Sequence, residues 1–105
     1  MKKKLPPIHP GEQLREEFMI PLGLSSNALA RALNVTPARI NEIARGRRGI
    51  SADTALRLAR FFNTSHQFWL NLQSNYDVQC AEDLAGRVIA RIQPFQSAVE
   101  QGAVR

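Results

Sequence analysis

Six side chains between residues 36 and 45 have the chemistry needed to read the edges of DNA base pairs. In the major groove an arginine such as Arg39 suits guanine, an asparagine such as Asn41 suits adenine, and a glutamate such as Glu42 can accept from cytosine. Small methyl-bearing side chains suit the thymine methyl group. The full set of predicted base-reading residues is Thr36, Ala38, Arg39, Asn41, Glu42 and Arg45. Glu42 has a simpler alternative, in which it pairs with Arg39 or Arg45 at helical spacing and only orients them.

A second set of residues is suited to gripping phosphate groups. These residues stand at predicted helix starts, or in the short loop between Gly46 and Gly49. Hydroxyls, helix-start amides and arginines all bind phosphate oxygens, and such contacts set register without carrying sequence information. The predicted phosphate-binding residues are Ser25, Ser26, Asn27, Arg47, Arg48 and Ser51.

The distribution of charge agrees with a polyanionic partner. The chain has 105 residues, a single domain's length, and a net charge of +5. Residues 25–64 carry seven arginines against Glu42 and Asp53, so the positive field lies in the middle third. Such a patch predicts nucleic acid as the partner. The alternative is an ordinary solvated helical surface.

Constellations typical of enzymes are missing from the sequence. His9 and His66 are far apart and belong to no metal-binding spacing, so capping or surface roles are expected for both. Cys80 is the single cysteine, which excludes a disulfide within the chain. Glu16 and Glu17 are adjacent, so on a helix they point about 100° apart and cannot work as a paired acid and base. We expect no catalytic activity, no bound metal and no cofactor.

The sequence also predicts a cytoplasmic protein. No stretch approaches the ~20 apolar residues needed to cross a bilayer, so no membrane partner is expected. The basic start of the chain is followed by no apolar segment of the kind found in secretory signals.

Helix punctuation along the chain predicts an all-α fold. Pro10 opens a first helix and Pro21 stops it, while Ser25 or Ser26 caps the next. Further starts are predicted at Thr36-Pro37, at Ser51, and at Ser65, where a fifth helix begins near His66. Residues 81–92 have an amphipathic pattern of their own, and the last residues are expected to fray.

Residues 26–45 have the pattern of a helix-turn-helix. Ala30 is small where the two helices must cross, and Asn34 stands where the chain leaves the first helix, a position that favours positive φ. Val35 fills the space between the helices, and Ile40 and Ile43 face inward. An ordinary αα-hairpin would need the same apolar spacing, but the small residue, the turn residue and the arginine excess together favour the helix-turn-helix.

The stretch from His9 to Asp77 resembles the HigA/VapI-type antitoxins of the XRE (Cro/C1-type) helix-turn-helix family. The residues that carry the resemblance are Ile8-His9-Pro10-Gly11-Glu12, Pro21-Leu22-Gly23-Leu24-Ser25, Ala30, Val35-Thr36-Pro37-Ala38-Arg39-Ile40-Asn41-Glu42, Arg45-Gly46-Arg47-Arg48-Gly49-Ile50, Asp53-Thr54-Ala55-Leu56-Arg57-Leu58-Ala59-Arg60-Phe61-Phe62, Phe68-Trp69-Leu70-Asn71-Leu72-Gln73 and Tyr76-Asp77. The chain departs from the family at Asn34, where glycine is usual, and asparagine also tolerates that backbone conformation.

The resemblance implies a five-helix, lambda-repressor-like domain. Residues 1–7 and 80–105 lie outside the resemblance, and we expect the DNA-binding domain to span residues 1–79 with a basic N-terminal arm over 1–7. Residues 80–105 are expected to form a partly helical or mobile extension. The resemblance further implies a dimeric antitoxin that binds operator DNA and represses its own operon. Such an antitoxin also neutralises a HigB-type toxin, a RelE-like mRNA endonuclease. Two other functions remain open at this stage: a free-standing XRE-type repressor without a toxin, and a protein-interaction module that does not bind DNA.

Operator recognition requires two copies of the recognition helix. One helix reads only a few base pairs, so a dimer must place two copies about one DNA turn, ~34 Å, apart. The fifth helix is the predicted dimer interface because it has more apolar surface than one core-facing stripe needs. The alternative is that some of these residues only complete the core of the monomer. The predicted interface residues are Phe68, Trp69, Leu70, Leu72 and Tyr76.

Overall fold

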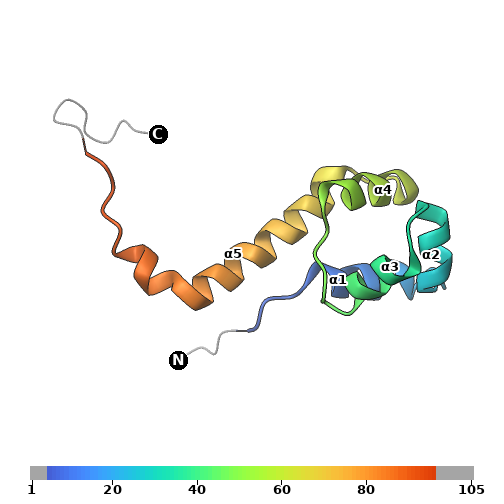
Figure 1. Ribbon diagram of the computed structural model, residues 1–105, viewed down its shortest axis with the longest axis horizontal. Helices are drawn as coiled ribbons and strands as arrows, with labels where there is room; N and C mark the ends of the chain where they lie inside the picture. The colour runs from blue at the N-terminus through green and yellow to red at the C-terminus, as the bar shows by residue number, and fades with distance from the viewer. Residues whose placement is uncertain (1–4, 97–105) are drawn as a thin grey trace.

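The computed structural model describes residues 5–96, and all the regular elements over that range are helices. In Figure 1 the shorter helices gather into one body, from which the long last helix leads away. The elements are α1 (Pro10–Gln13), continued by the π-helical η1 (Leu14–Met19), α2 (Ser26–Leu33), α3 (Pro37–Ala44), α4 (Ala52–Phe62) and α5 (His66–Ala90). The predicted all-α, five-helix fold is confirmed.

Four helices begin at residues whose side-chain oxygen caps the first turn. Ser25, Thr36, Ser51 and Ser65 each accept a hydrogen bond from the backbone N–H three residues further on, over 3.0, 3.2, 3.3 and 3.0 Å. Each bond satisfies an amide that would otherwise lack an intrahelical partner. The helix starts predicted at these positions are confirmed.

Two helices end at asparagines in the left-handed region. Asn34 closes α2 with φ 60°, and Asn63 closes α4 with φ 58°. Asparagine reaches this conformation more readily than other non-glycine residues. The positive φ expected at Asn34 is confirmed, so the turn forms without the usual glycine.

The core lies where α1, η1, α2, α3, α4 and the first turn of α5 meet. Trp69 has no exposed surface, and its indole Nε1 donates to Thr64 Oγ1 over 2.8 Å. The aliphatic side chains around this centre include the inward-facing pair of α3. Fully buried members of the core are Leu14, Leu29, Ile40, Ile43, Ala55, Leu58 and Trp69.

The long α5 runs without a break through Cys80, across the predicted boundary between residues 79 and 80. The helical pattern of residues 81–92 is therefore realised up to Ala90 as a continuation of α5 rather than as a separate helix. The division of the chain into 1–79 and 80–105 remains a prediction. Residues 1–4 of the basic arm and residues 97–105 lie outside the described part of the chain.

Within residues 5–96, no helix is both long enough and apolar enough to cross a bilayer.

His9 makes the start of α1 sensitive to pH. Its Nδ1 accepts a hydrogen bond from the Gly11 N–H over 2.8 Å, as only an unprotonated ring nitrogen can. The ring also meets the Tyr76 ring edge-on, with centroids 4.9 Å apart. Burial lowers the pKa of His9 below its ordinary value of 6.5, and the carboxylate of Asp77 opposes this shift. The capping role expected for His9 is thus realised.

Because the folded state binds this proton less readily than the unfolded state, acidification should destabilise the fold. The contribution of His9 is fully present above pH 6.5 and is lost as pH falls through the lowered pKa. Urea unfolding of the wild type and of His9→Asn should therefore diverge below pH 6.5 in favour of the variant, since asparagine caps a helix without titrating there. A difference in unfolding free energy that stays constant with pH would contradict this role of His9.

Candidate nucleic-acid interface

The α2 and α3 helices form a helix-turn-helix. Ala30, only 1% exposed, sits in the core on α2, and the turn is closed by hydrogen bonds from Asn34 N–H to the Arg31 carbonyl and from Val35 N–H to the Ala30 carbonyl. Val35 is half-buried against the core, as predicted. This arrangement turns one side of α3 inward and leaves the other side free.

The free side of α3 presents polar and small side chains to solvent. Ile40 and Ile43 are fully buried, while Thr36, Ala38, Asn41 and Arg45 are exposed. Ala38, Asn41 and Arg45 are spaced at i, i+3 and i+7, so they lie on one face of α3. Within the described residues, the side chains of Asn41 and Arg45 make no hydrogen bond or ion pair. Both are therefore available to an external ligand.

Glu42 is paired, but with a partner that the sequence did not indicate. Its Oε1 accepts from Arg48 Nε over 2.9 Å, and both side chains are about half exposed. The expected alternative, pairing with Arg39 or Arg45, is wrong, because the loop after α3 folds back and brings Arg48 to Glu42. The pair lies at the end of the exposed face of α3 and joins that helix to the loop.

Arg39 differs from the other predicted base-reading residues. Its Nη1 donates to Asp53 Oδ2 over 2.8 Å and lies 3.5 Å from Thr54 Oγ1, so the guanidinium faces the first turn of α4. Because Arg39 follows Ala38 directly, its side chain points about 100° away from that of Ala38 and leaves α3 at the edge of the exposed face. Its guanidinium is thus engaged within the chain, and direct base reading by Arg39 stays a prediction.

The predicted phosphate-binding residues differ in whether their side chains already have a partner within the chain. Ser25 and Ser51 already accept from backbone amides as helix caps, and Ser51 also donates to Thr54 Oγ1 over 3.3 Å. Asn27 at the start of α2 and Arg47 in the loop are exposed, whereas Ser26 is half-buried. Arg48 already forms an ion pair with Glu42. Of the six, Asn27 and Arg47 are exposed with no side-chain partner in the described part of the chain.

Pairing reduces the free positive charge of the middle third. Asp53 engages Arg39 and Arg57, and Glu42 engages Arg48. The arginines of residues 25–64 with no ion pair inside the described structure are Arg31, Arg45, Arg47 and Arg60. Arg31 also lines a shallow groove between α2 and α3 together with Asn27. The structure thus adds Arg31 to the phosphate-binding candidates.

Two arginines that the sequence analysis did not single out hold the helix-turn-helix in place. Arg15 Nη1 donates to the Ala44 carbonyl at the end of α3 over 2.6 Å, and Arg57 Nη1 donates to the Leu33 carbonyl at the end of α2 over 2.8 Å. Cations are favourable at helix C-termini, where carbonyls lack intrahelical partners. Only the Asp53–Arg57 spacing of i, i+4 was a local signal for this role.

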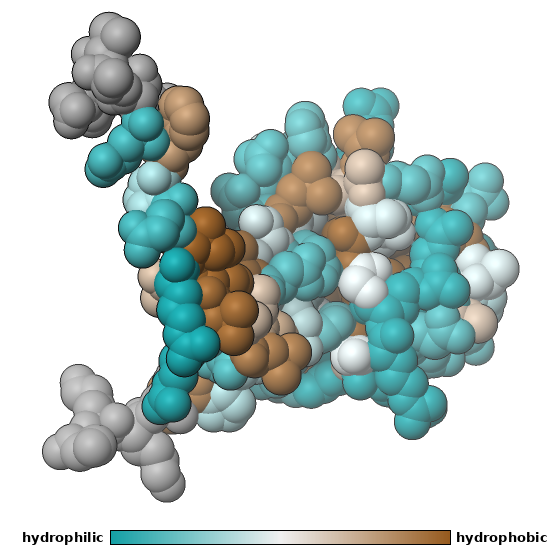
Figure 2. Space-filling view, turned by 60° about the vertical axis from the view of Figure 1, so that its left-hand side comes forward, coloured by the Kyte–Doolittle hydropathy of each residue, from teal (hydrophilic) through white to brown (hydrophobic). Residues whose placement is uncertain are grey.

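The predicted dimer interface needs one correction. Trp69 is completely buried in the core of the monomer, so it has no surface left to contribute to a second chain. Leu70 and Leu72 are half-buried against the same core, Tyr76 packs on His9, and Phe68 is 37% exposed. Along α5 itself, more exposed apolar residues follow these, among them Leu84, which is 89% exposed. In Figure 2, hydrophobic side chains gather along one side of the segment that leads away from the body.

No group of histidine, cysteine, aspartate and glutamate side chains suited to hold a metal ion occurs among residues 5–96.

Known proteins share both the sequence and the fold of this chain. The helix-turn-helix family model HTH_3 matches residues 13–69. The "Virulence-associated protein I" of Dichelobacter nodosus is 60% identical over 81 residues, 77% of this chain and 75% of that protein. The "Antitoxin HigA-1" of Vibrio cholerae is 31% identical over 103 residues, 97% of this chain and 96% of that protein.

A solved structure extends the similarity to a protein bound to DNA. The structure of the Pseudomonas aeruginosa antitoxin HigA with the higBA promoter matches this fold with a TM-score of 0.81 and 52% identity. The match covers 85% of this chain and 98% of the HigA chain. Nearly the whole of that protein is therefore similar in fold to the present chain.

Proposed function

This chain belongs to the XRE-type helix-turn-helix family, in the group of the HigA- and VapI-type antitoxins, and we propose that it binds operator DNA as a homodimer. In this role it represses its own operon and neutralises a HigB-type toxin. The proposal depends most on the exposed face of α3, where Asn41 and Arg45 have no side-chain partner in the described structure and lie opposite two buried isoleucines. The relative from Pseudomonas aeruginosa, solved with a promoter, supports it. The role is a cytoplasmic one.

In the proposed complex, α3 enters the major groove, whose width of ~12 Å accommodates a helix. Base edges are read by Thr36, Ala38, Asn41, Glu42 and Arg45. Phosphates on either side are held by two groups of residues, one at the start of α2 and the other in the loop and cap before α4. These phosphate-binding residues are Ser25, Ser26, Asn27, Arg31, Arg47, Arg48 and Ser51.

The dimer is proposed to form through α5. Phe68, Leu70, Leu72 and Tyr76 remain candidates for the interface, because each retains some surface in the monomer. Two copies of α3 held by such an interface would reach half-sites about one DNA turn apart.

Arg47→Ala tests whether the loop after α3 contacts DNA phosphates. Fluorescence anisotropy with labelled DNA from upstream of the gene should give weaker binding and a plot of log K against log salt whose slope is smaller by about 1, because one phosphate contact is lost. Arg87→Ala removes an equally exposed charge from α5 and should leave the slope unchanged. Identical slopes for the wild type and Arg47→Ala would remove Arg47 from the interface.

Co-expression tests whether this chain binds a HigB-type toxin. A tagged copy of this chain, expressed with the product of a small basic reading frame beside its gene, should retain that product through affinity and size-exclusion steps. If no complex forms while upstream DNA is still bound, the chain is a free-standing repressor. If DNA is not bound even at low salt, a protein-interaction role replaces both.

A further inference from the structure

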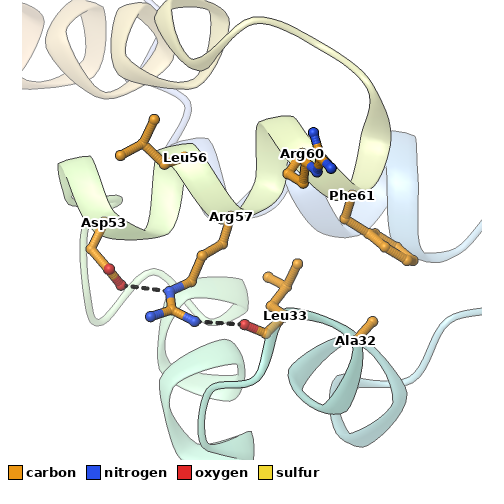
Figure 3. A pocket seen from close by; sticks show the side chains of 7 residues that line it. All are labelled: Ala32, Leu33, Asp53, Leu56, Arg57, Arg60 and Phe61. Atoms are coloured by element: carbon orange, nitrogen blue, oxygen red, sulfur yellow. Dashed lines mark hydrogen bonds and ion pairs between the residues drawn. The ribbon is translucent and has the colours of Figure 1, made fainter.

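One carboxylate joins the three helices around the helix-turn-helix. Asp53, in the first turn of α4, accepts at a single oxygen, Oδ2, from Arg39 Nη1 of α3 over 2.8 Å and from Arg57 Nε of α4 over 2.9 Å. Figure 3 shows Arg57 lying between Asp53 and the end of α2, where it donates to the Leu33 carbonyl. Arg57 Nη1, which makes this bond, also lies 3.3 Å from the Asn34 carbonyl in the turn.

These contacts form a continuous chain from the turn to α3. Arg57 holds the last carbonyls of α2, Asp53 holds Arg57, and Arg39 connects Asp53 to the first turn of α3. The hydrogen bonds from Arg57 and Arg39 also lower the pKa of Asp53 below its ordinary value. Asp53 is more than half exposed, and an exposed pair of this kind adds little to stability. What these contacts do provide is a direct link from α3 through Asp53 and Arg57 to the end of α2.

We propose that Asp53 is a positioning residue for base reading, which holds Arg39 and Arg57 so that α3 presents Asn41 and Arg45 to the groove in one orientation. The inference rests on the proposed DNA-binding function and assigns Arg39 to the support of α3. A groove contact is sensitive to small displacements, because bidentate hydrogen bonds to base edges require defined geometry. Loss of the carboxylate should therefore lower specificity more than affinity.

Asp53→Asn separates these two quantities. We expect the ratio of affinities for upstream DNA and scrambled DNA of the same length to fall about tenfold, a size typical of coupled residues. Binding to scrambled DNA should hold or rise, because a negative charge is removed near the phosphates. Glu82→Gln removes an exposed carboxylate from α5 and should leave the ratio unchanged. An unchanged ratio for Asp53→Asn would overturn the proposal.

A double-mutant cycle distinguishes positioning from direct reading. If Arg39 acts only through Asp53, then Arg39→Ala, Asp53→Asn and the double variant should lose specificity by the same factor. If Arg39 reads a base itself, Arg39→Ala should lose far more than Asp53→Asn, and the proposal fails. Arg57→Gln breaks the same chain at its other end and should reproduce the loss if Asp53→Asn does not fold.

A readout without DNA completes the test. Amide hydrogen exchange in the first turn of α3 should accelerate in Asp53→Asn and stay at the wild-type rate in Glu82→Gln. Unchanged exchange in both would overturn the positioning role even if DNA binding were altered. A wild type that does not distinguish upstream from scrambled DNA would instead refute the proposed function on which this role depends.

Discussion

Replacing Asn41 and Arg45 together by alanine is expected to abolish the preference for operator DNA while leaving the protein folded. Both side chains are exposed on the free face of α3, and neither has a side-chain partner in the described structure, so their loss leaves no buried group unsatisfied. A good base contact contributes about 1–3 kcal/mol of discrimination. The two losses together should therefore reduce operator affinity by roughly 10²–10⁴-fold, as measured by anisotropy against upstream and scrambled DNA.

The control for this variant must also remove a charge. Arg87→Ala on α5 does so outside the helix-turn-helix and should bind the operator like the wild type. Binding to scrambled DNA should weaken only modestly in the Asn41/Arg45 variant, since the phosphate contacts remain. If the variant still preferred the operator by the wild-type factor, α3 would not be the reading helix.

Gly11→Ala should cause a large loss of stability. Gly11 is buried in α1, where an added Cβ would overlap the backbone carbonyl oxygen of Ile43 in α3. A backbone group cannot move aside as the end of a side chain can, so α1 and α3 would have to separate. Overpacking typically costs about 1–3 kcal/mol, and a clash with backbone should lie at the upper end of that range, which urea unfolding monitored by circular dichroism would register.

Gly86→Ala provides the matched comparison. Gly86 lies within α5, and a Cβ there would meet no heavy atom within 4 Å. Since alanine favours a helix interior over glycine, this variant should gain up to about 1 kcal/mol. Equal effects of the two substitutions would show that the close approach of α1 to α3 does not contribute to stability.

The features that the sequence predicted correctly depend on local chemistry. Ser25, Thr36 and Ser51 predict helix starts because the side chain of each accepts from an amide in the first turn of its own helix. Asn34 marks the end of α2 because its own backbone tolerates a positive φ. The buried and exposed sides of α3 follow from helical periodicity alone.

The features that the sequence did not reveal depend on residues distant along the chain. Arg39 is engaged by Asp53, 14 residues away, and Arg15 by the Ala44 carbonyl, 29 residues away. An outward arginine has the same local pattern whether it meets DNA, solvent or a carboxylate. Trp69 could be predicted either as an interface residue or as a core residue for a similar reason. Its burial depends on helices from the rest of the chain, which cover it.

Cleavage of DNA by a tethered reagent shows directly whether the free face of α3 enters the groove in two copies. With the single cysteine replaced, as in Cys80→Ser, a Pro37→Cys variant can carry an iron chelate at the exposed start of α3, beside the base-reading residues. On upstream DNA we expect two clusters of cuts whose centres lie about one helical turn apart. The same chelate on Leu84→Cys in α5 serves as the control. Cuts that are absent or uniform with the Pro37 probe, or focused instead by the Leu84 probe, would show that this face of α3 does not enter the groove.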